Sequence, residues 1–78
     1  MSIDITMPDV GEGVTEATVV AWLKQVGDPV AAGEVIVEIM TDKASMEVEA
    51  PAGGVLGEII HGADEEVRIG TVIGRIEE

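Results

Sequence analysis

The chain contains no cysteine, phenylalanine or tyrosine, and only one tryptophan among its 78 residues. Without cysteine, the polypeptide has no disulfide framework, no thiolate metal site and no catalytic thiol. With a single large aromatic side chain, the core must consist of Val, Ile, Leu, Ala and Met, which favours a thin, even layer between two close sheets. The length allows one domain, spanning residues 1–78.

Basic residues are also scarce: four Lys and Arg stand against sixteen Asp and Glu, giving a net charge of −12. Phosphate binding depends on clustered Lys and Arg, so we expect no nucleic-acid partner. Such an acidic surface repels its own copies, favours a monomer and can steer the domain toward basic rims of enzyme active sites. The apolar runs are far shorter than the ~20 residues needed to span a bilayer, so we expect a soluble protein with no membrane partner and no targeting signal.

The hydrophobic pattern predicts an all-β fold. Apolar residues repeat every second position, and ten glycines interrupt every window long enough for a helix. Residues 8–14 and 62–66 have the composition of surface loops. Strands are expected over residues 3–7, 18–23, 35–41, 46–50, 55–60 and 72–76, with residues 30–33 as a short extended or turn element.

The second half of the chain repeats the first with an offset of 37 residues. Val30 matches Val67, Gly33 matches Gly70, and the strand expected at residues 35–39 matches residues 72–76. Two copies of a four-strand unit in one small domain indicate a quasi-twofold pair of sheets packed face to face. The pattern therefore predicts a small β-sandwich.

Residues 35–50 read as a hairpin, because two alternating β-branched runs flank the polar segment 42–45. Asp42 suits the first position of a type I turn, where its carboxylate can accept a backbone N–H, and Lys43 and Ala44 suit the central positions. Lys43 then lies at the apex, at the opposite end of the molecule from the two termini. We interpret Lys43 as an attachment point; the alternative is an ordinary solvated turn lysine.

No catalytic or metal-binding constellation is present in the sequence. Ser45, His61 and the scattered carboxylates give no nucleophile–base arrangement, and a hairpin tip offers no apolar pocket for a Schiff-base lysine. His61 has no Cys, His or suitably spaced carboxylates with which to complete a metal shell. The segment 11–13, Gly-Glu-Gly, begins a dinucleotide fingerprint, but the third glycine is missing and no helix follows.

Residues 38–44, Glu-Ile-Met-Thr-Asp-Lys-Ala, closely resemble the lipoylation motif of lipoyl domains in 2-oxo acid dehydrogenase complexes. Residues 7–13, 22–24, 27–28 and 50–54 resemble further motifs of that family in the same order, so the resemblance covers the whole chain. It implies a flattened eight-stranded barrel of two four-stranded antiparallel sheets, a barrel-sandwich hybrid. It also implies a single lipoyl domain, expected to be the N-terminal domain of a larger acyltransferase.

The resemblance implies lipoic acid joined to Lys43 through an amide, attached by a lipoate ligase or lipoyl transferase. This arm would be reductively acylated by a thiamine-diphosphate-dependent 2-oxo acid decarboxylase. It would then pass the acyl group to coenzyme A at the acyltransferase catalytic domain and be reoxidised by dihydrolipoamide dehydrogenase. The domain would be a carrier rather than an enzyme, located in a bacterial or archaeal cytoplasm or in the mitochondrial matrix.

The resemblance also implies that the decarboxylase reads the protein surface around the lysine. For Asp42, turn capping is an equally good explanation, and for the two loop glycines backbone geometry is the larger part. The family pattern is broken at Ala17 and at Asp64-Glu65, where glycine and Gly-Asp are usual, but Asp tolerates left-handed backbone geometry. The expected recognition residues are Asp42, Ala44, Asp9, Gly11, Glu12, Gly13 and Val14.

Three other assignments compete with a lipoyl domain of a 2-oxo acid dehydrogenase complex. A biotin carrier domain of a carboxylase would have methionines next to the lysine, whereas here Met40 and Met46 are three positions away. An unmodified structural β-module would need no exposed lysine at the tip. A lipoylated glycine-cleavage carrier is a longer protein with helical additions. The sequence leaves open which 2-oxo acid is processed.

Overall fold

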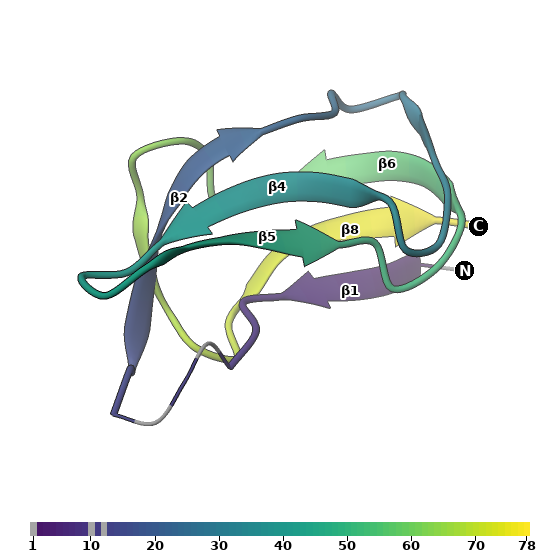
Figure 1. Ribbon diagram of the computed structural model, residues 1–78. Coiled ribbons are helices and arrows are strands. Elements are labelled where there is room, and N and C mark those ends of the chain that lie inside the picture. Colours follow the sequence, from purple (N-terminus) through teal and green to yellow (C-terminus); the bar gives the residue numbers. More distant parts are fainter. Residues whose placement is uncertain (1, 10, 12) are drawn as a thin grey trace.

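The computed structural model describes residues 2–9, 11 and 13–78, and these form eight strands without a helix, as the alternating pattern predicts. The longer strands are labelled in Figure 1. Within these residues, no helix could cross a membrane. One short strand, at residues 66–68, was not expected, because the polar residues before it indicate a loop. The strands are β1 (Ser2–Thr6), β2 (Glu16–Trp22), β3 (Pro29–Val30), β4 (Val35–Met40), β5 (Ser45–Glu49), β6 (Gly54–Ile59), β7 (Glu66–Arg68) and β8 (Val72–Glu77).

The strands form two four-stranded antiparallel sheets, with the orders β1-β8-β6-β3 and β5-β4-β2-β7. This confirms the two-sheet fold, but each half of the chain contributes two strands to each sheet instead of forming a sheet of its own. The two halves are therefore interlocked, and neither can bury its apolar face without the other.

The quasi-twofold relation predicted from the repeat is present in the hydrogen bonds. Gly27 N–H donates to the Leu56 carbonyl at 2.7 Å, and at the equivalent place Asp64 N–H donates to the Val19 carbonyl at 2.7 Å. Strands β4 and β8 also have the same sequence of buried and exposed positions. The packing of the two sheets thus determines which positions of each repeat are buried.

The core between the sheets is aliphatic, as the composition requires. Each fully buried Val, Ile, Leu or Met side chain contributes about 1.5–3 kcal/mol through removal of apolar surface from water. The half-buried Trp22 packs against this core beside Gly74, where a Cβ atom would lie 2.8 Å from the indole ring. The buried residues are Ile5, Met7, Ala17, Val19, Val30, Ile36, Val37, Ile39, Val48, Ala50, Leu56, Val67, Ile73 and Ile76.

The ends of the molecule are clearly different (Figure 1). The N- and C-termini lie side by side at one end, where Ser2 of β1 pairs with Glu77 of β8. The turn between β4 and β5 projects from the opposite end, along the 34 Å axis of the molecule. The expected position of the lysine turn relative to the termini is confirmed.

Candidate functional site

The turn between β4 and β5 has two residues, Asp42 and Lys43. Thr41 N–H donates to the Ala44 carbonyl at 2.8 Å, which closes the hairpin on either side of them. The Thr41 hydroxyl oxygen accepts the N–H groups of Lys43 and Ala44, both at 3.1 Å. These bonds fix the backbone of the lysine itself and leave its side chain exposed.

The turn begins one residue earlier than the sequence indicated. Asp42 was expected at the first position with its carboxylate as the cap, but Thr41 holds that position and its hydroxyl makes the capping bonds. Ser45 is already part of β5, where it pairs with Met40, and the bond from Thr41 N–H to the Ala44 carbonyl leaves only Asp42 and Lys43 for the loop. Among the hydrogen bonds of the described residues none ends on the Asp42 carboxylate, which removes turn capping as its role.

Lys43 differs from the other basic residues in its surroundings. Lys24 Nζ forms an ion pair with Glu34 at 2.9 Å, and Arg75 pairs with both Asp4 and Glu58. In the described part of the chain no ion pair involves Lys43. Conversion of its ammonium to an uncharged amide would therefore break no internal charge pair among these residues.

The loop between β1 and β2 approaches the lysine turn. A Cβ atom placed on Gly13 would lie 4.0 Å from Lys43 Nζ, and Gly13 has a φ of 81°, a conformation that favours glycine. Gly11 N–H donates to the Asp9 carboxylate at 3.1 Å, which holds the start of the loop. Glu12, also expected to take part in recognition, lies outside the described residues.

A shallow depression joins this loop to the turn. Gly13 and Val14 line it from the loop, and Thr41 and Asp42 line it from the hairpin. The structure thus brings together two segments, the loop and the turn, that were proposed as recognition elements from the family resemblance. Ala44 is exposed at the base of the turn.

Two carboxylates at this depression were not identified from the sequence. Glu16 of β2 and Glu66 of β7 also line it, and their side chains share a hydrogen bond that, with their mutual repulsion, raises the pKa of Glu66. Their proximity depends on the pairing of β2 with β7. Because β7 was not predicted, no sequence signal indicated this pair.

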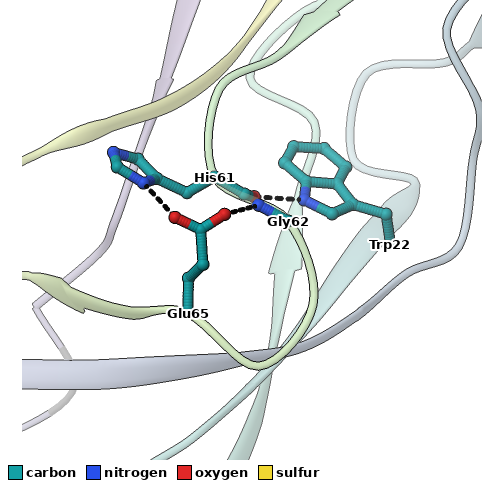
Figure 2. Close-up of polar contacts among 4 residues, drawn as sticks. All are labelled: Trp22, His61, Gly62 and Glu65. Carbon is teal, nitrogen blue, oxygen red and sulfur yellow. Dashed lines mark hydrogen bonds and ion pairs between the residues drawn. The ribbon is translucent and has the colours of Figure 1, made fainter.

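His61, the one histidine, belongs to a structural cluster in the turn between β6 and β7 (Figure 2). Its Nδ1 lies 3.0 Å from Glu65 Oε1, while Glu65 Oε2 accepts the Gly62 N–H and Trp22 Nε1 donates to the His61 carbonyl at 2.8 Å. The bonds from His61 and Gly62 hold the pKa of Glu65 below its ordinary value. Over the described ranges, no group of three or more potential ligand side chains could hold a metal ion.

Comparison with known proteins places this geometry in a family. The Biotin_lipoyl family, described as biotin-requiring enzyme, matches residues 3–76. The solution structure of the lipoyl domain of the 2-oxoglutarate dehydrogenase complex from Azotobacter vinelandii superposes with a TM-score of 0.79. The two are 41% identical, and the match covers 97% of this chain and 96% of that one.

Curated relatives are acyltransferase components. The chain is 45% identical over 73 residues to the dihydrolipoyllysine-residue acetyltransferase component of the pyruvate dehydrogenase complex of Corynebacterium glutamicum, covering 94% of this chain and 11% of the relative. It is also 45% identical over 78 residues to the succinyltransferase component of the 2-oxoglutarate dehydrogenase complex of Rickettsia typhi, covering 100% of this chain and 20% of the relative. The chain thus spans only a small part of these relatives. It belongs to the biotinyl/lipoyl attachment family, in which it is a lipoyl domain, a carrier with no catalytic role of its own.

Proposed function

We propose that Lys43 is the attachment point of a lipoyl group and that the domain carries this group between the active sites of a 2-oxo acid dehydrogenase complex. The observation that supports this most strongly is the two-residue turn. It places one amine, with its backbone fixed by Thr41, at the end of the molecule opposite the termini. A modifying enzyme can therefore reach Nζ while any tether stays distant.

The residues around Lys43 are compatible with an amide-linked lipoyl group. The exposed side chain leaves space for a long substituent, and Gly13 presents no side chain toward Nζ. When bound, the lipoyl group would supply the dithiolane chemistry that this cysteine-free chain lacks, accepting an acyl group and giving it up to coenzyme A. The protein would contribute position, since a tethered arm meets the next active site at a high effective concentration.

The names of the relatives support a role in an acyltransferase of such a complex. We infer three partners for the loaded domain: a thiamine-diphosphate-dependent decarboxylase, the acyltransferase catalytic domain and dihydrolipoamide dehydrogenase. A lipoate ligase or lipoyl transferase would attach the cofactor. Recognition by the decarboxylase would use the residues beside the lysine, Asp42 and Ala44, and the loop that approaches it.

Enzymatic modification followed by mass spectrometry tests the attachment site. The domain is incubated with lipoate ligase, lipoate and ATP, and separately with biotin ligase, biotin and ATP. Lys43→Gln is the test variant, and Lys24→Gln is the matched control because Lys24 is the only other lysine. We expect one lipoyl addition on the wild type and on Lys24→Gln, none on Lys43→Gln, and peptide mapping to locate it on Lys43.

The other outcomes distinguish the competing functions. Addition of biotin in place of lipoate would identify a biotin carrier, in agreement with the broader description of the family. No addition by either ligase would leave an unmodified structural module. Lipoylation of Lys24 would contradict the assignment of the turn.

A further inference from the structure

The outer face of the sheet that carries the lysine hairpin has an exposed apolar centre. Val20 of β2 is 39% exposed and Met40 of β4 is 46% exposed. Together with Ser45 and Glu47 of β5 and Glu38 of β4, they line a shallow depression of about 420 Å³ that crosses three strands. Met40 and Ser45 form the last strand pair before the turn, so this face begins at the base of the lysine hairpin.

Carboxylates border this apolar centre on both sides. Glu38 and Glu47 are directly opposite each other on β4 and β5, while Glu16 and Glu66 lie on the neighbouring strands β2 and β7 and line the depression beside the turn. Like charges that face each other across strands are destabilising. Arg68, opposite Glu16 on β7, is the basic residue of this face.

On the quasi-twofold-related face of the other sheet, the carboxylates are paired with a basic residue. Arg75 of β8 stands at the position equivalent to Glu38, with Asp4 opposite it at the position equivalent to Glu47. Arg75 neutralises Asp4 at 3.1 Å and Glu58 at 2.6 Å. The same backbone therefore accommodates a neutralised arrangement, so the facing carboxylates of β4 and β5 are not a requirement of the fold.

From this asymmetry we propose that the outer face of β5-β4-β2 is a docking surface for the decarboxylase that uses the arm on Lys43. We define this docking face by Val20, Glu38, Met40, Ser45 and Glu47. The partner surface that fits it has an apolar contact bordered by Lys or Arg side chains, next to the active site that the arm would reach. Oppositely charged partner groups would pair with Glu38 and Glu47 on binding and speed association.

This proposal rests on the proposed function, because the partner of the docking face is the enzyme that uses the lipoyl arm on Lys43. It adds to that function the surface to which the partner binds. It differs from the loop and turn residues already proposed for recognition, since it is a strand surface extending from the hairpin along β4 and β5. An arm on Lys43 that reaches into an active site would bring this face against the rim of that site, because the face begins at the base of the hairpin. A pair of carboxylates and an apolar centre at that place would orient the domain.

Titration of the unmodified domain tests docking without any dependence on the cofactor. Isotope-labelled Lys43→Gln domain is titrated with purified pyruvate decarboxylase and 2-oxoglutarate decarboxylase components while amide resonances are followed by NMR. We expect perturbation of β4, β5 and β2 resonances with one of them, and an affinity that falls as salt is raised. Glu38→Gln with Glu47→Gln should weaken binding to it by about tenfold.

A matched variant on the related face provides the control. The double variant Asp4→Asn, Glu77→Gln also removes two negative charges, but from the outer face of the other sheet. This variant should bind the decarboxylase within about twofold of the wild-type affinity. Equal weakening by both variants would reduce the effect to net charge and overturn the docking face. Perturbations confined to the turn and the β1–β2 loop, or no binding to either decarboxylase, would also overturn it.

The failure of this proposal is distinguishable from the failure of the proposed function. Lipoylation of the wild-type domain is measured separately by mass spectrometry. If Lys43 is lipoylated and the docking face shows no perturbation, the carrier role stands and the docking face is wrong. If Lys43 is not lipoylated by the ligase, the carrier role is wrong and the docking face loses its basis.

Discussion

Strands β4 and β8 are equivalent members of the two sheets, and they differ at their outward-facing positions and at one core position, where Val37 corresponds to Gly74. Both have two adjacent buried residues followed by a half-buried and another buried position. On the outside, Glu38 of β4 faces Glu47, whereas Arg75 of β8 holds two carboxylates. Packing between the sheets therefore requires small or apolar residues at the inward positions of both strands, while the residues at the outward positions are free to serve binding.

A second difference between the halves involves size. Trp22 of β2 packs beside Gly74 of β8, and the equivalent positions in the other half hold Ile59 and Val37. A large side chain beside glycine thus corresponds to two side chains of intermediate size. The two halves therefore share a fold, but they fill equivalent space in the core with side chains of different sizes.

The largest expected effect tests the equivalence of the cores. Ile36 and Ile73 are equivalent and both are 0% exposed. Replacement of either by Ala should lower the free energy of unfolding by about 2–5 kcal/mol, because each leaves a cavity between the sheets. Urea denaturation measures both. Costs that differ by more than about 2 kcal/mol would mean that the two halves are packed with unequal tightness.

The next effect tests the division of volume between Trp22 and Gly74. Gly74→Val should destabilise the domain by about 1–3 kcal/mol, because the new side chain meets the indole ring and the Glu58 carbonyl. Trp22→Ile added to Gly74→Val recreates the residue types of the other half and should recover part of that loss. Thermal unfolding of the two single variants and the double variant measures the coupling. Additive losses would contradict the size compensation.

A smaller effect is expected at the turn between β4 and β5. Thr41→Ala removes the acceptor for two N–H groups and should cost about 1 kcal/mol of stability. The freed backbone should also lower the rate of Lys43 lipoylation. Thr41→Ser keeps the hydroxyl and should behave like the wild type, as measured by denaturation and by ligase kinetics. Unchanged kinetics in Thr41→Ala would show that the ligase does not need a fixed turn.

The smallest effect is a difference in pH dependence between two neighbouring carboxylates. The pKa of Glu65 is lowered below 4.5 by its bond with His61, so its contribution is present above that pH and is lost as pH falls through the lowered pKa. The pKa of Glu66 is raised above 4.5 by its bond with Glu16, so its contribution is present below that pH and is lost as pH rises through the raised pKa.

Denaturation from pH 3 to pH 7 separates the two carboxylates. Relative to the wild type, Glu65→Gln should lose stability mainly at the neutral end, and Glu66→Gln should gain it there. Glu77→Gln, an exposed position on the other sheet, is the control and should show neither change. The same sign of change for Glu65→Gln and Glu66→Gln would contradict the opposite environments of these side chains.

Much of the fold follows from the alternation and the repeat, because a two-residue period fixes which side chains face the core. The strand from Val35 and its equivalent from Val72 were predicted with starts that the structure confirms. Strand β7 could not be predicted, since its polar residues form a strand only by pairing with β2. The contribution of each half to both sheets is likewise decided by tertiary packing.

The candidate site divides in the same way. The apex lysine could be predicted from the two flanking runs, but the capping residue could not, because Thr41 and Asp42 both have short oxygen-bearing side chains suited to a turn. The register of β4 with β5 selected Thr41. The facing carboxylates Glu38 and Glu47 also depend on that register, and no local pattern indicates it.

Moving the lysine by one position along the turn tests the central claim most directly. Lys43→Ala is combined with Ala44→Lys, and separately with Asp42→Lys, so that each variant keeps one exposed lysine at the tip. Lipoate ligase should modify only the wild-type arrangement, measured by intact mass after equal incubation, because the fixed turn aims a side chain from position 43 alone. Equal modification of the shifted lysines would contradict the claim that the geometry of this turn defines the site.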